Sequence, residues 1–233
     1  MPESDLRDVS LIAVTSHEMR SPLAAIRGFV DMLQRRRDEL TEDEIDEFLQ
    51  VIAAQTDRLI RLADDLVTME SLEDVSLTVV SAPIVLVPAL EQLVREIPGG
   101  ADRIELRISA DAPPTIESDA LRLGQVLTNL LTNALKYSEE TADVTMEVGP
   151  VTDDEIGIAV IDHGIGIEAI ERERVFEPFY RTAEGARSAE GSGLGLAIAR
   201  RLVEALRGEV TTEPTPGGGT TFRVRLPVRA AAC

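Results

Sequence analysis

The chain has 233 residues, enough for one or two domains, and 44% of them are hydrophobic, which is sufficient for a buried core. Its formal net charge of −19 argues against nucleic acid or an anionic membrane surface as a partner, because both attract basic surfaces. The single cysteine, Cys233, leaves no disulfide framework, and no stretch is long and apolar enough for a membrane segment or a signal peptide. We therefore expect a soluble, cytoplasmic protein.

Residues 5–72 have the pattern of two long amphipathic helices joined by a charge-rich connection. In the first helix, two sets of residues repeat every seven positions and predict an apolar seam with one polar position. The sets are Val9, Ser16, Leu23 and Val30, and Ile12, Met19, Ile26 and Leu33. In the second helix, apolar residues follow steps of four and three from Phe48 to Met69. Thr41 and Glu44 have the spacing of a capping box that opens this helix.

Each helix carries only one narrow apolar stripe, so a single hairpin would leave part of its apolar surface exposed. We expect two copies to pair into a dimeric four-helix bundle.

His17, one of only two histidines, lies beside the predicted seam, next to Glu18 and one turn before Pro22. A lone histidine is more often structural than functional. A proline inside a helix costs about 3 kcal/mol, however, and leaves the carbonyl of Glu18 without its helical donor. These neighbours therefore favour a functional, solvent-facing histidine at a local bend of the helix.

Residues 73–78 form a boundary after which β-branched runs alternate with helical segments. Strands are expected at 76–80, 103–108, 114–117, 143–148, 155–162, 208–214 and 220–228, and helices at 87–97, 118–137 and 191–206. Ser118 or Asp119 caps the middle helix. The pattern predicts an α+β two-layer sandwich with a mostly antiparallel sheet and helices on one face. The expected domains are thus a helical hairpin at 1–73 and an α+β domain at 77–228.

Rare residue types gather in the predicted helix at 118–137. Asn129 and Asn133 are the only asparagines of the chain, and Lys136 is its only lysine. Asn129, Asn133 and Tyr137 are spaced by four, so they share one helix face. Amide oxygens, an ammonium group and an aromatic ring on one stripe suit a metal–phosphate ligand that carries a base.

Two glycine-rich segments follow. In "DHGIGI", Asp162 ends a strand, and Gly164 and Gly166 permit close approach of the backbone. In "GSGLGL", glycines precede a helix whose N-terminus can bind an anion. The second segment is not a Walker A loop, because no Gly-Lys-Ser/Thr follows. Each segment alone is a weak signal, but the asparagine helix and the two boxes in this order are much more specific.

Five motifs together resemble those of the catalytic core of two-component sensor histidine kinases. "SHEMRSPLAAI" resembles the histidine box, "NLLTNALKYS" the asparagine box, "DHGIGI" and "GSGLGL" the two glycine boxes, and "VFEPFYR" the phenylalanine box. The resemblance covers about residues 5–228. It implies a dimeric phosphotransfer hairpin followed by an ATP-binding sandwich of the GHKL (Bergerat) fold, shared with gyrase and mismatch-repair ATPases.

The resemblance also implies roles for individual residues. His17 would accept the γ-phosphoryl group of ATP, Glu18 would be the general base, and Asn133 would hold Mg²⁺. The implied ATP-binding residues are Asn129, Asn133, Lys136, Tyr137, Asp162, Gly164, Gly166, Gly191, Gly193, Gly195 and, from a polar, mobile lid at 177–190, Arg181. Ser21 stands where members with strong phosphatase activity often have Thr or Asn, which makes it the candidate for a phosphatase role.

The implied partner is a separate response regulator, which would receive the phosphoryl group on an aspartate. It would dock below His17 at Ala24, Gly28 and Phe29, with hairpin packing as an equally supported role for Phe29. Alternatives to the kinase are a protein that acts mainly as a phosphatase, a nucleotide-binding dimeric scaffold, and a gyrase-like clamp, the last of which would not need the histidine box. The heptad pattern runs almost to Met1, which suggests a fragment of a longer, perhaps membrane-bound, sensor.

Overall fold

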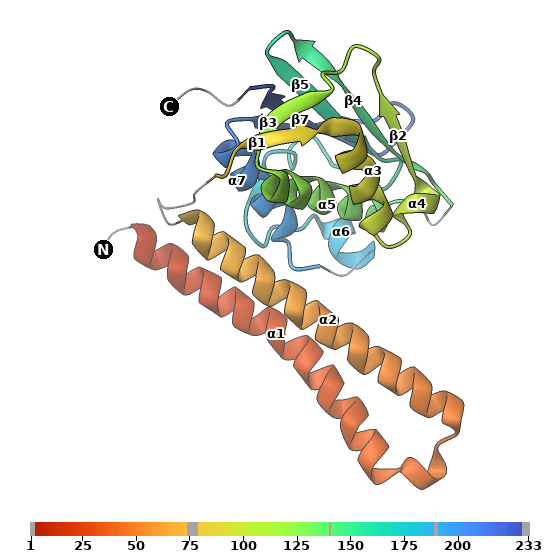
Figure 1. Ribbon diagram of the computed structural model, residues 1–233. Helices are drawn as coiled ribbons and strands as arrows, with labels where there is room; N and C mark the ends of the chain where they lie inside the picture. Colours follow the sequence, from red (N-terminus) through yellow and green to blue (C-terminus); the bar gives the residue numbers. More distant parts are fainter. Residues whose placement is uncertain (1–2, 74–78, 140, 189–190, 230–233) are drawn as a thin grey trace. The chain divides into compact units, whose positions relative to one another are not determined.

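The computed structural model describes residues 3–73, 79–139, 141–188 and 191–229 (Figure 1). The chain divides into two compact units, Met1–Thr68 and Met69–Cys233. None of the helices in the described ranges has the length and apolar character needed to cross a membrane.

The first unit is a helical hairpin, as predicted. Helix α1 (Glu3–Arg35) is followed by a 3₁₀ turn, η1 (Arg37–Glu39), and by α2 (Glu42–Glu73). The capping box is confirmed: the Thr41 N–H donates to Glu44 (2.8 Å), and the Glu44 N–H donates to the Thr41 hydroxyl (3.3 Å). These two bonds satisfy donors that a helix start leaves without intrahelical partners.

The predicted seam of α1 is wrong at Ser16 and Leu23; Val30 of the same heptad set is partly buried, and the side chains of Val9 and Ile12 lie outside those that the structure describes. Leu23 is 53% exposed and Ser16 is exposed, whereas Pro22 is buried and Thr15 and Phe29 are partly buried. The seam thus runs through Thr15, Met19, Pro22, Ile26, Phe29 and Leu33. Both stripes have helical spacing, so the sequence alone does not choose between them. The Phe29 ring, 5.1 Å from the Phe48 ring between centroids, favours the observed face.

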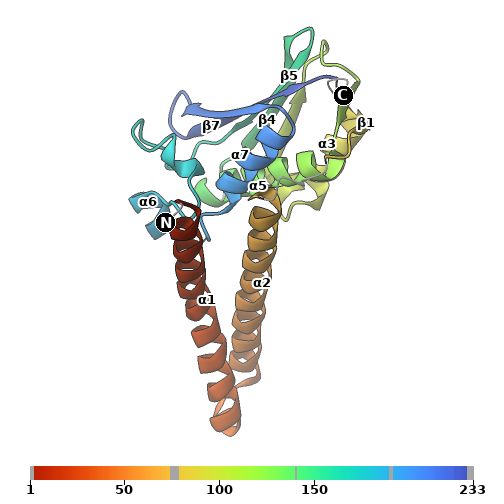
Figure 2. The ribbon, with the colours of Figure 1, turned by 90° about the vertical axis from the view of Figure 1, so that its left-hand side faces the viewer.

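The second unit is built on a five-stranded sheet in the order β2-β4-β5-β7-β6. Its strands are β2 (Ile104–Ile108), β4 (Val144–Thr152), β5 (Glu155–Ile161), β7 (Thr220–Pro227) and β6 (Glu209–Pro214). Strands β2 and β4 are parallel, and the other pairs are antiparallel. Helices α3 (Leu86–Glu96), α5 (Ala120–Tyr137) and α7 (Gly195–Ala205) lie on one face of the sheet (Figures 1 and 2). The predicted two-layer α+β sandwich is confirmed.

Four short elements of this unit differ from the expected pattern. The strand predicted at 76–80 is instead β1 (Ala82–Val85), which pairs with β3 (Thr115–Ser118) in a separate antiparallel ribbon. Val79 and Val80 are in no strand, and residues 76–78 lie outside the described ranges. The structure also contains short helices at α4 (Gly100–Arg103), η2 (Arg174–Phe176) and α6 (Ala183–Ser188) that the sequence pattern did not predict.

The core of the second unit is aliphatic, as the scarcity of aromatic residues predicts. Side chains from α5, α7 and the inner face of the sheet are almost completely buried there; they include Val126, Leu130, Leu131, Met146, Ile158, Val160, Ile198, Leu202 and Phe222. Phe176 adds an edge-to-face contact with Phe222 at 6.3 Å between ring centroids. The helices are therefore fixed to the sheet over their apolar stripes.

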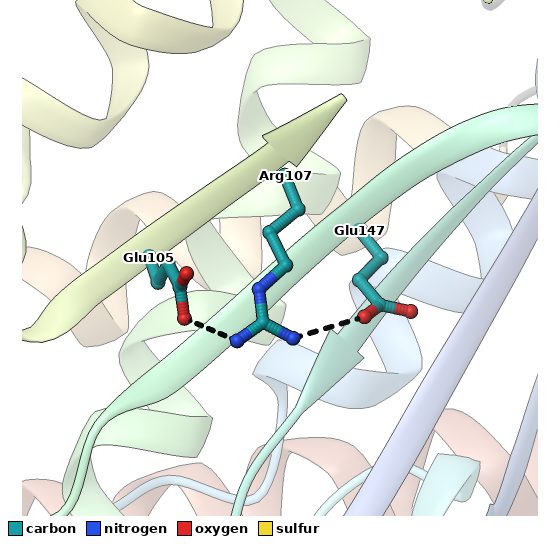
Figure 3. Close-up of polar contacts among 3 residues, drawn as sticks. All are labelled: Glu105, Arg107 and Glu147. Carbon is teal, nitrogen blue, oxygen red and sulfur yellow. Dashed lines mark hydrogen bonds and ion pairs between the residues drawn. The ribbon is translucent and has the colours of Figure 1, made fainter. Parts of the chain in front are cut away.

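The other face of the sheet is polar where β2 forms its edge. Arg107 lies between Glu105 (2.6 Å) and Glu147 (3.4 Å), which Figure 3 shows on the two parallel strands. The guanidinium lowers the pKa of the Glu105 carboxyl, mainly through their hydrogen bond. Charged side chains at an edge strand discourage pairing with another chain.

The burial of α5 leads to a stability prediction. Leu130→Ala removes a side chain with no exposed surface, so we expect the free energy of unfolding to fall by about 2–5 kcal/mol. Leu121→Ala, on the same helix but at a position 73% exposed, should change it by less than about 0.5 kcal/mol. Urea unfolding followed by circular dichroism measures both, and equal effects would contradict this assignment of the core.

Candidate nucleotide and phosphotransfer site

The asparagine helix is α5, and it begins at a defined cap. Asp119 accepts the Arg122 N–H (3.1 Å) and settles the cap that the sequence left open between Ser118 and Asp119. Ten residues further on, the Asn129 amide donates to the Gly195 carbonyl (3.1 Å) at the start of α7. Asn133 is half-buried, and its amide makes no hydrogen bond to any residue in the described part of the chain. Asn133 thus has an amide oxygen available to a ligand.

Lys136 and Tyr137 end α5 next to Gly191 and Gly185, respectively. The Lys136 ammonium lies 4.9 Å from the centroid of the Tyr137 ring. A Cβ atom added at Gly191 would collide with this ammonium, and one added at Gly185 would lie 3.5 Å from the Tyr137 ring. The only lysine of the chain therefore has its ammonium beside Gly191, the first glycine of the second glycine box.

Asp162 is the buried charged group of the site. Its side chain is 4% exposed, and its Oδ1 accepts N–H groups from Gly164 (2.9 Å) and Thr220 (3.0 Å). Burial raises the pKa of this carboxyl, although both backbone hydrogen bonds act in the opposite direction. Within the described ranges, Oδ2 has no hydrogen-bond partner. One oxygen thus holds the local backbone, and the other can accept a hydrogen bond from a ligand.

Glycines are required around Asp162 because backbone segments meet there. A Cβ atom at Gly164 would collide with the carbonyl of Tyr137, and one at Gly219 (φ +101°) would collide with the carbonyl of Asp162. Gly166 also has a positive φ (+75°) and lies against Gly219. The end of β5, the end of α5 and the β6–β7 turn are therefore packed backbone against backbone.

The sequence analysis did not single out Gly219 and Thr220, because the former lies between two expected strands and the latter at the start of one. The signal was present in the three consecutive glycines, all with positive φ, followed directly by Thr220. His163 is exposed, and its Nδ1 lies 3.3 Å from the Gly218 carbonyl oxygen of the β6–β7 turn.

The second glycine box is joined to the phenylalanine box. The Phe179 N–H donates to the Gly193 carbonyl (2.9 Å), and both residues have positive φ values, 62° and 73°. A Cβ atom at Gly193 would lie 2.8 Å from the Phe179 backbone. Between these residues, Arg181 donates to the Gly185 carbonyl (3.0 Å), so its guanidinium contacts the lid backbone here. Helix α7 begins at Gly195, so the second glycine box forms the approach to its N-terminus and its first residues.

The hairpin carries the other predicted residues. His17 lies within α1, but its side chain is not among those that the structure describes. Glu18 forms an ion pair across the hairpin with Arg58 of α2 (3.7 Å), a residue that the sequence pattern did not single out.

The predicted docking residues differ in exposure. Ser21, Ala24 and Gly28 are exposed, whereas Phe29 contacts Phe48 inside the hairpin. Hairpin packing therefore accounts for the position of Phe29.

The arrangement offers partners for both the base and the phosphates of a nucleotide. Within the described residues, no group of three or more His, Cys, Asp or Glu side chains could hold a metal ion. The site instead offers a buried carboxylate acceptor, amide oxygens, one ammonium group and a helix N-terminus. The carboxylate can accept a hydrogen bond from the amino group of a nucleobase, and the ammonium group and the helix N-terminus can bind phosphate oxygens.

Comparison with known proteins agrees with this geometry. Residues 9–75 match the His Kinase A (phospho-acceptor) domain, and residues 118–230 match the histidine kinase-, DNA gyrase B-, and HSP90-like ATPase. The sensor histidine kinase WalK of Bacillus subtilis is 34% identical over 229 residues, which cover 94% of this chain and 36% of WalK. The signal transduction histidine-protein kinase BaeS of Escherichia coli is 32% identical over 226 residues, which cover 93% of this chain and 46% of BaeS.

The chain thus spans less than half the length of either relative. Among solved structures, full-length ShkA in complex with AMPPNP is similar with a TM-score of 0.68 and 28% identity, over 96% of this chain and 47% of ShkA. With both domain models matched in order along one chain, the protein belongs to the two-component sensor histidine kinases and comprises the phospho-acceptor and ATPase domains of their catalytic core.

Proposed function

We propose that this chain is an ATP-dependent protein-histidine kinase that phosphorylates its own His17. The observation that carries the proposal is the Asp162 carboxylate, buried beside the end of α5 with one oxygen bound to backbone and the other available. Oδ2 would accept a hydrogen bond from the adenine amino group. The glycine backbone at 164 and 166 would lie against the base, with Tyr137 beside it.

Residues of α5 and of the second glycine box would hold the phosphates. Lys136 and Asn129 lie beside Gly191 and Gly195, respectively, so side chains and backbone N–H groups would converge on one anion. Gly193 would let the backbone approach the phosphates, and Arg181 would exchange its bond to Gly185 for a phosphate oxygen. The net charge of −19 makes such local donors necessary, because the overall field repels ATP.

Asn133 would be the protein ligand of Mg²⁺, since its half-buried amide has an oxygen available. Magnesium keeps several waters and uses phosphate oxygens as ligands, so one or two protein oxygens are sufficient. When bound, it would neutralise phosphate charge.

The chemical step would use His17 and Glu18. An imidazole nitrogen of neutral His17 attacks the γ-phosphorus, the bond to the β-phosphate bridging oxygen breaks, and ADP leaves. Glu18 takes the proton from the other ring nitrogen. An unperturbed histidine has a pKa of about 6.5, so much of it is neutral at pH 7. Arg58, 3.7 Å from Glu18, would orient the carboxylate of this base.

A response regulator would then receive the phosphoryl group on an aspartate. The exposed positions Ala24 and Gly28, two and three turns beyond His17, leave room for a docked partner, and a Cβ at Gly28 would meet no atom within 4 Å. A second activity, dephosphorylation of that regulator, is favoured by Ser21, whose side chain is exposed one turn from His17. The hairpin at 1–73 and the ATP-binding domain at 77–228 would be the functional domains.

Assembly into a homodimer is supported by a second apolar stripe on α2. Leu49, Ile60 and Val67 are 50%, 54% and 63% exposed, and their spacing of eleven and seven residues places them on one helix face. That face is distinct from the one that carries Phe48. A second hairpin would cover it in a four-helix bundle.

The kinase proposal is tested with γ-labelled ATP and Mg²⁺. We expect acid-labile, alkali-stable label on the wild type, none on His17→Gln, and about 100-fold less on Asn133→Ala. Thr132→Ala is the matched control, because Thr132 is exposed one residue away on the same helix. A wild-type chain that binds ATP but takes up no label would refute the proposal.

Asp162→Asn should lower the affinity for ATP without lowering the stability of the fold. Asn can keep the two backbone hydrogen bonds through Oδ1, but its NH₂ group would face the adenine amino group. We therefore expect ATP affinity to fall about 10- to 100-fold, as for one unpaired polar contact. Isothermal titration measures the loss, and unchanged affinity would remove Asp162 from the base-binding role.

The same variant should be at least as stable as the wild type at pH 7. Burial raises the folded-state pKa of Asp162 above its ordinary value of 3.8, so the folded state loses stability as pH rises through that window. Asn does not titrate and avoids this cost. The Tm advantage of Asp162→Asn should therefore be largest near neutral pH and shrink toward pH 4, as read by calorimetry.

The proposed dimer interface is tested by placing a charged residue on the exposed stripe of Leu49, Ile60 and Val67. Ile60→Asp should shift the chain toward monomer in sedimentation velocity, because it would bury a carboxylate without a partner. Ala54→Asp adds the same charge at an exposed position away from the stripe and should leave the distribution unchanged. Equal behaviour of the two variants would show that this face is not the interface.

A further inference from the structure

Phe179 is a bulky residue held in the left-handed region of backbone conformation. Its φ is +62°, which is costly for an aromatic residue and persists only where surrounding contacts hold it. The Phe179 N–H donates to the Gly193 carbonyl (2.9 Å), and the backbones of the two residues are so close that Gly193 has no room for a Cβ atom. The contacts that hold Phe179 in this conformation therefore also hold the backbone of Gly193.

The next residue, Tyr180, makes such contacts with both its backbone and its side chain. Its hydroxyl donates to Glu171 (2.8 Å), its N–H donates to the Glu177 carbonyl (3.1 Å), and the Arg174 guanidinium lies 4.3 Å from the centroid of its ring. The hydrogen bond to Glu171 raises the pKa of the Tyr180 phenol above its ordinary value of 10.0, so the hydroxyl remains a donor at neutral pH. Three residues of the segment 171–177 thus restrain the position of Tyr180.

The segment 171–177 is itself fixed to the core of the second unit. Val175 and Phe176 are each 6% exposed, and Phe176 packs edge-to-face on Phe222 of β7. The Val175 N–H donates to the Glu171 carbonyl (2.9 Å), which ties Glu171 to these buried neighbours. Glu171 therefore has a defined position, and a hydrogen bond to its carboxylate restrains Tyr180 relative to the core.

We propose that Tyr180 is a positioning residue for the phosphate part of the nucleotide site. Its hydrogen bond to Glu171 keeps the neighbouring Phe179 in the left-handed conformation. Phe179 in turn keeps the Gly193 backbone where the phosphates of ATP would lie. Tyr180 thus acts through its neighbours and not by contact with ATP. The inference rests on the proposed nucleotide site, in which Gly193 lets the backbone approach the phosphates.

Tyr180→Phe removes the hydroxyl and keeps the ring that Arg174 contacts. We expect the Kd of ATP and of ADP to rise about fivefold, as for the loss of one hydrogen bond. The Kd of adenosine should stay within about twofold of wild type, because the base contacts proposed for Asp162 are unchanged. Isothermal titration of the full chain measures all three, and the Phe179 amide should exchange faster with solvent. Unchanged ATP affinity, unchanged exchange, or an equal loss for adenosine and ATP would overturn the proposal.

Variants of Glu171 test the same bond from its other end. Glu171→Ala removes the acceptor and should weaken ATP binding as much as Tyr180→Phe, whereas Glu171→Gln keeps an acceptor oxygen and should restore wild-type affinity. The double variant Tyr180→Phe/Glu171→Ala should bind ATP no more weakly than either single variant, because both remove the same bond. Glu173→Ala is the matched control, because its side chain is on the same segment but 86% exposed. Additive losses, or equal losses in Glu171→Gln and Glu171→Ala, would contradict the role of this bond.

The wild type separates failure of this inference from failure of the nucleotide site. A wild-type chain that does not bind ATP would remove the site, and this inference with it. A wild type that binds ATP, together with unchanged affinity in Tyr180→Phe and Glu171→Ala, would remove the inference alone.

Discussion

The arrangement of the nucleotide domain depends on one buried carboxylate. Asp162 ends β5, and its Oδ1 holds the N–H groups of Gly164 and Thr220, which come from segments 56 residues apart in the sequence. Those bonds draw the β6–β7 turn and the first glycine box so close that neither Gly164 nor Gly219 has room for a Cβ atom. The glycines are therefore a consequence of the carboxylate position. Burial disfavours the charged form and raises the pKa of the Asp162 carboxyl, so the charge costs stability, while its second oxygen would serve the proposed ligand as an acceptor.

In this acidic chain, carboxylates accept backbone N–H groups at helix starts and at turns between elements. Glu44 accepts the N–H of Thr41 where the hairpin turns, Asp119 binds Val80 and Arg122 where the nucleotide domain begins, and Asp162 binds at the adenine end of the proposed site. Backbone donors at helix starts and turns otherwise lack partners, and a carboxylate satisfies them with charge-assisted bonds. The excess of acidic residues is therefore partly structural. Two cations also have specific positions, each within its own unit: Lys136 lies at Gly191, and Arg58 of the hairpin pairs with Glu18.

Local patterns predicted most elements of the second unit, the capping box and the two-layer architecture, because hydrophobic period, caps and glycines act over a few residues. The motif residues on α5 and in the glycine boxes were also found this way, and the structure brings Asn129 to Gly195 and Lys136 to Gly191. What the sequence did not predict depends on distant contacts. Thr220 joins the site only through Asp162, β1 is defined by its pairing with β3, and the seam of α1 is selected by the contact of Phe29 with Phe48. Helix α6 is short and polar, so its sequence lacks the repeating apolar positions from which a helix is predicted.

The two units differ in how well they bury their own apolar surface, and this difference bears on the proposed chemistry. Among the described side chains of residues 15–68, Pro22 and Leu62 alone are buried, whereas the nucleotide domain has a continuous core from α5 through the sheet to α7. Hydrophobic burial is the main favourable term in folding, so the hairpin by itself has little to stabilise it. A second hairpin on the stripe of Leu49, Ile60 and Val67 would supply the missing contacts. In that case the helix that carries His17 and Glu18 is fully ordered only in the dimer, and phosphoryl transfer is tied to assembly even though ATP binding is not.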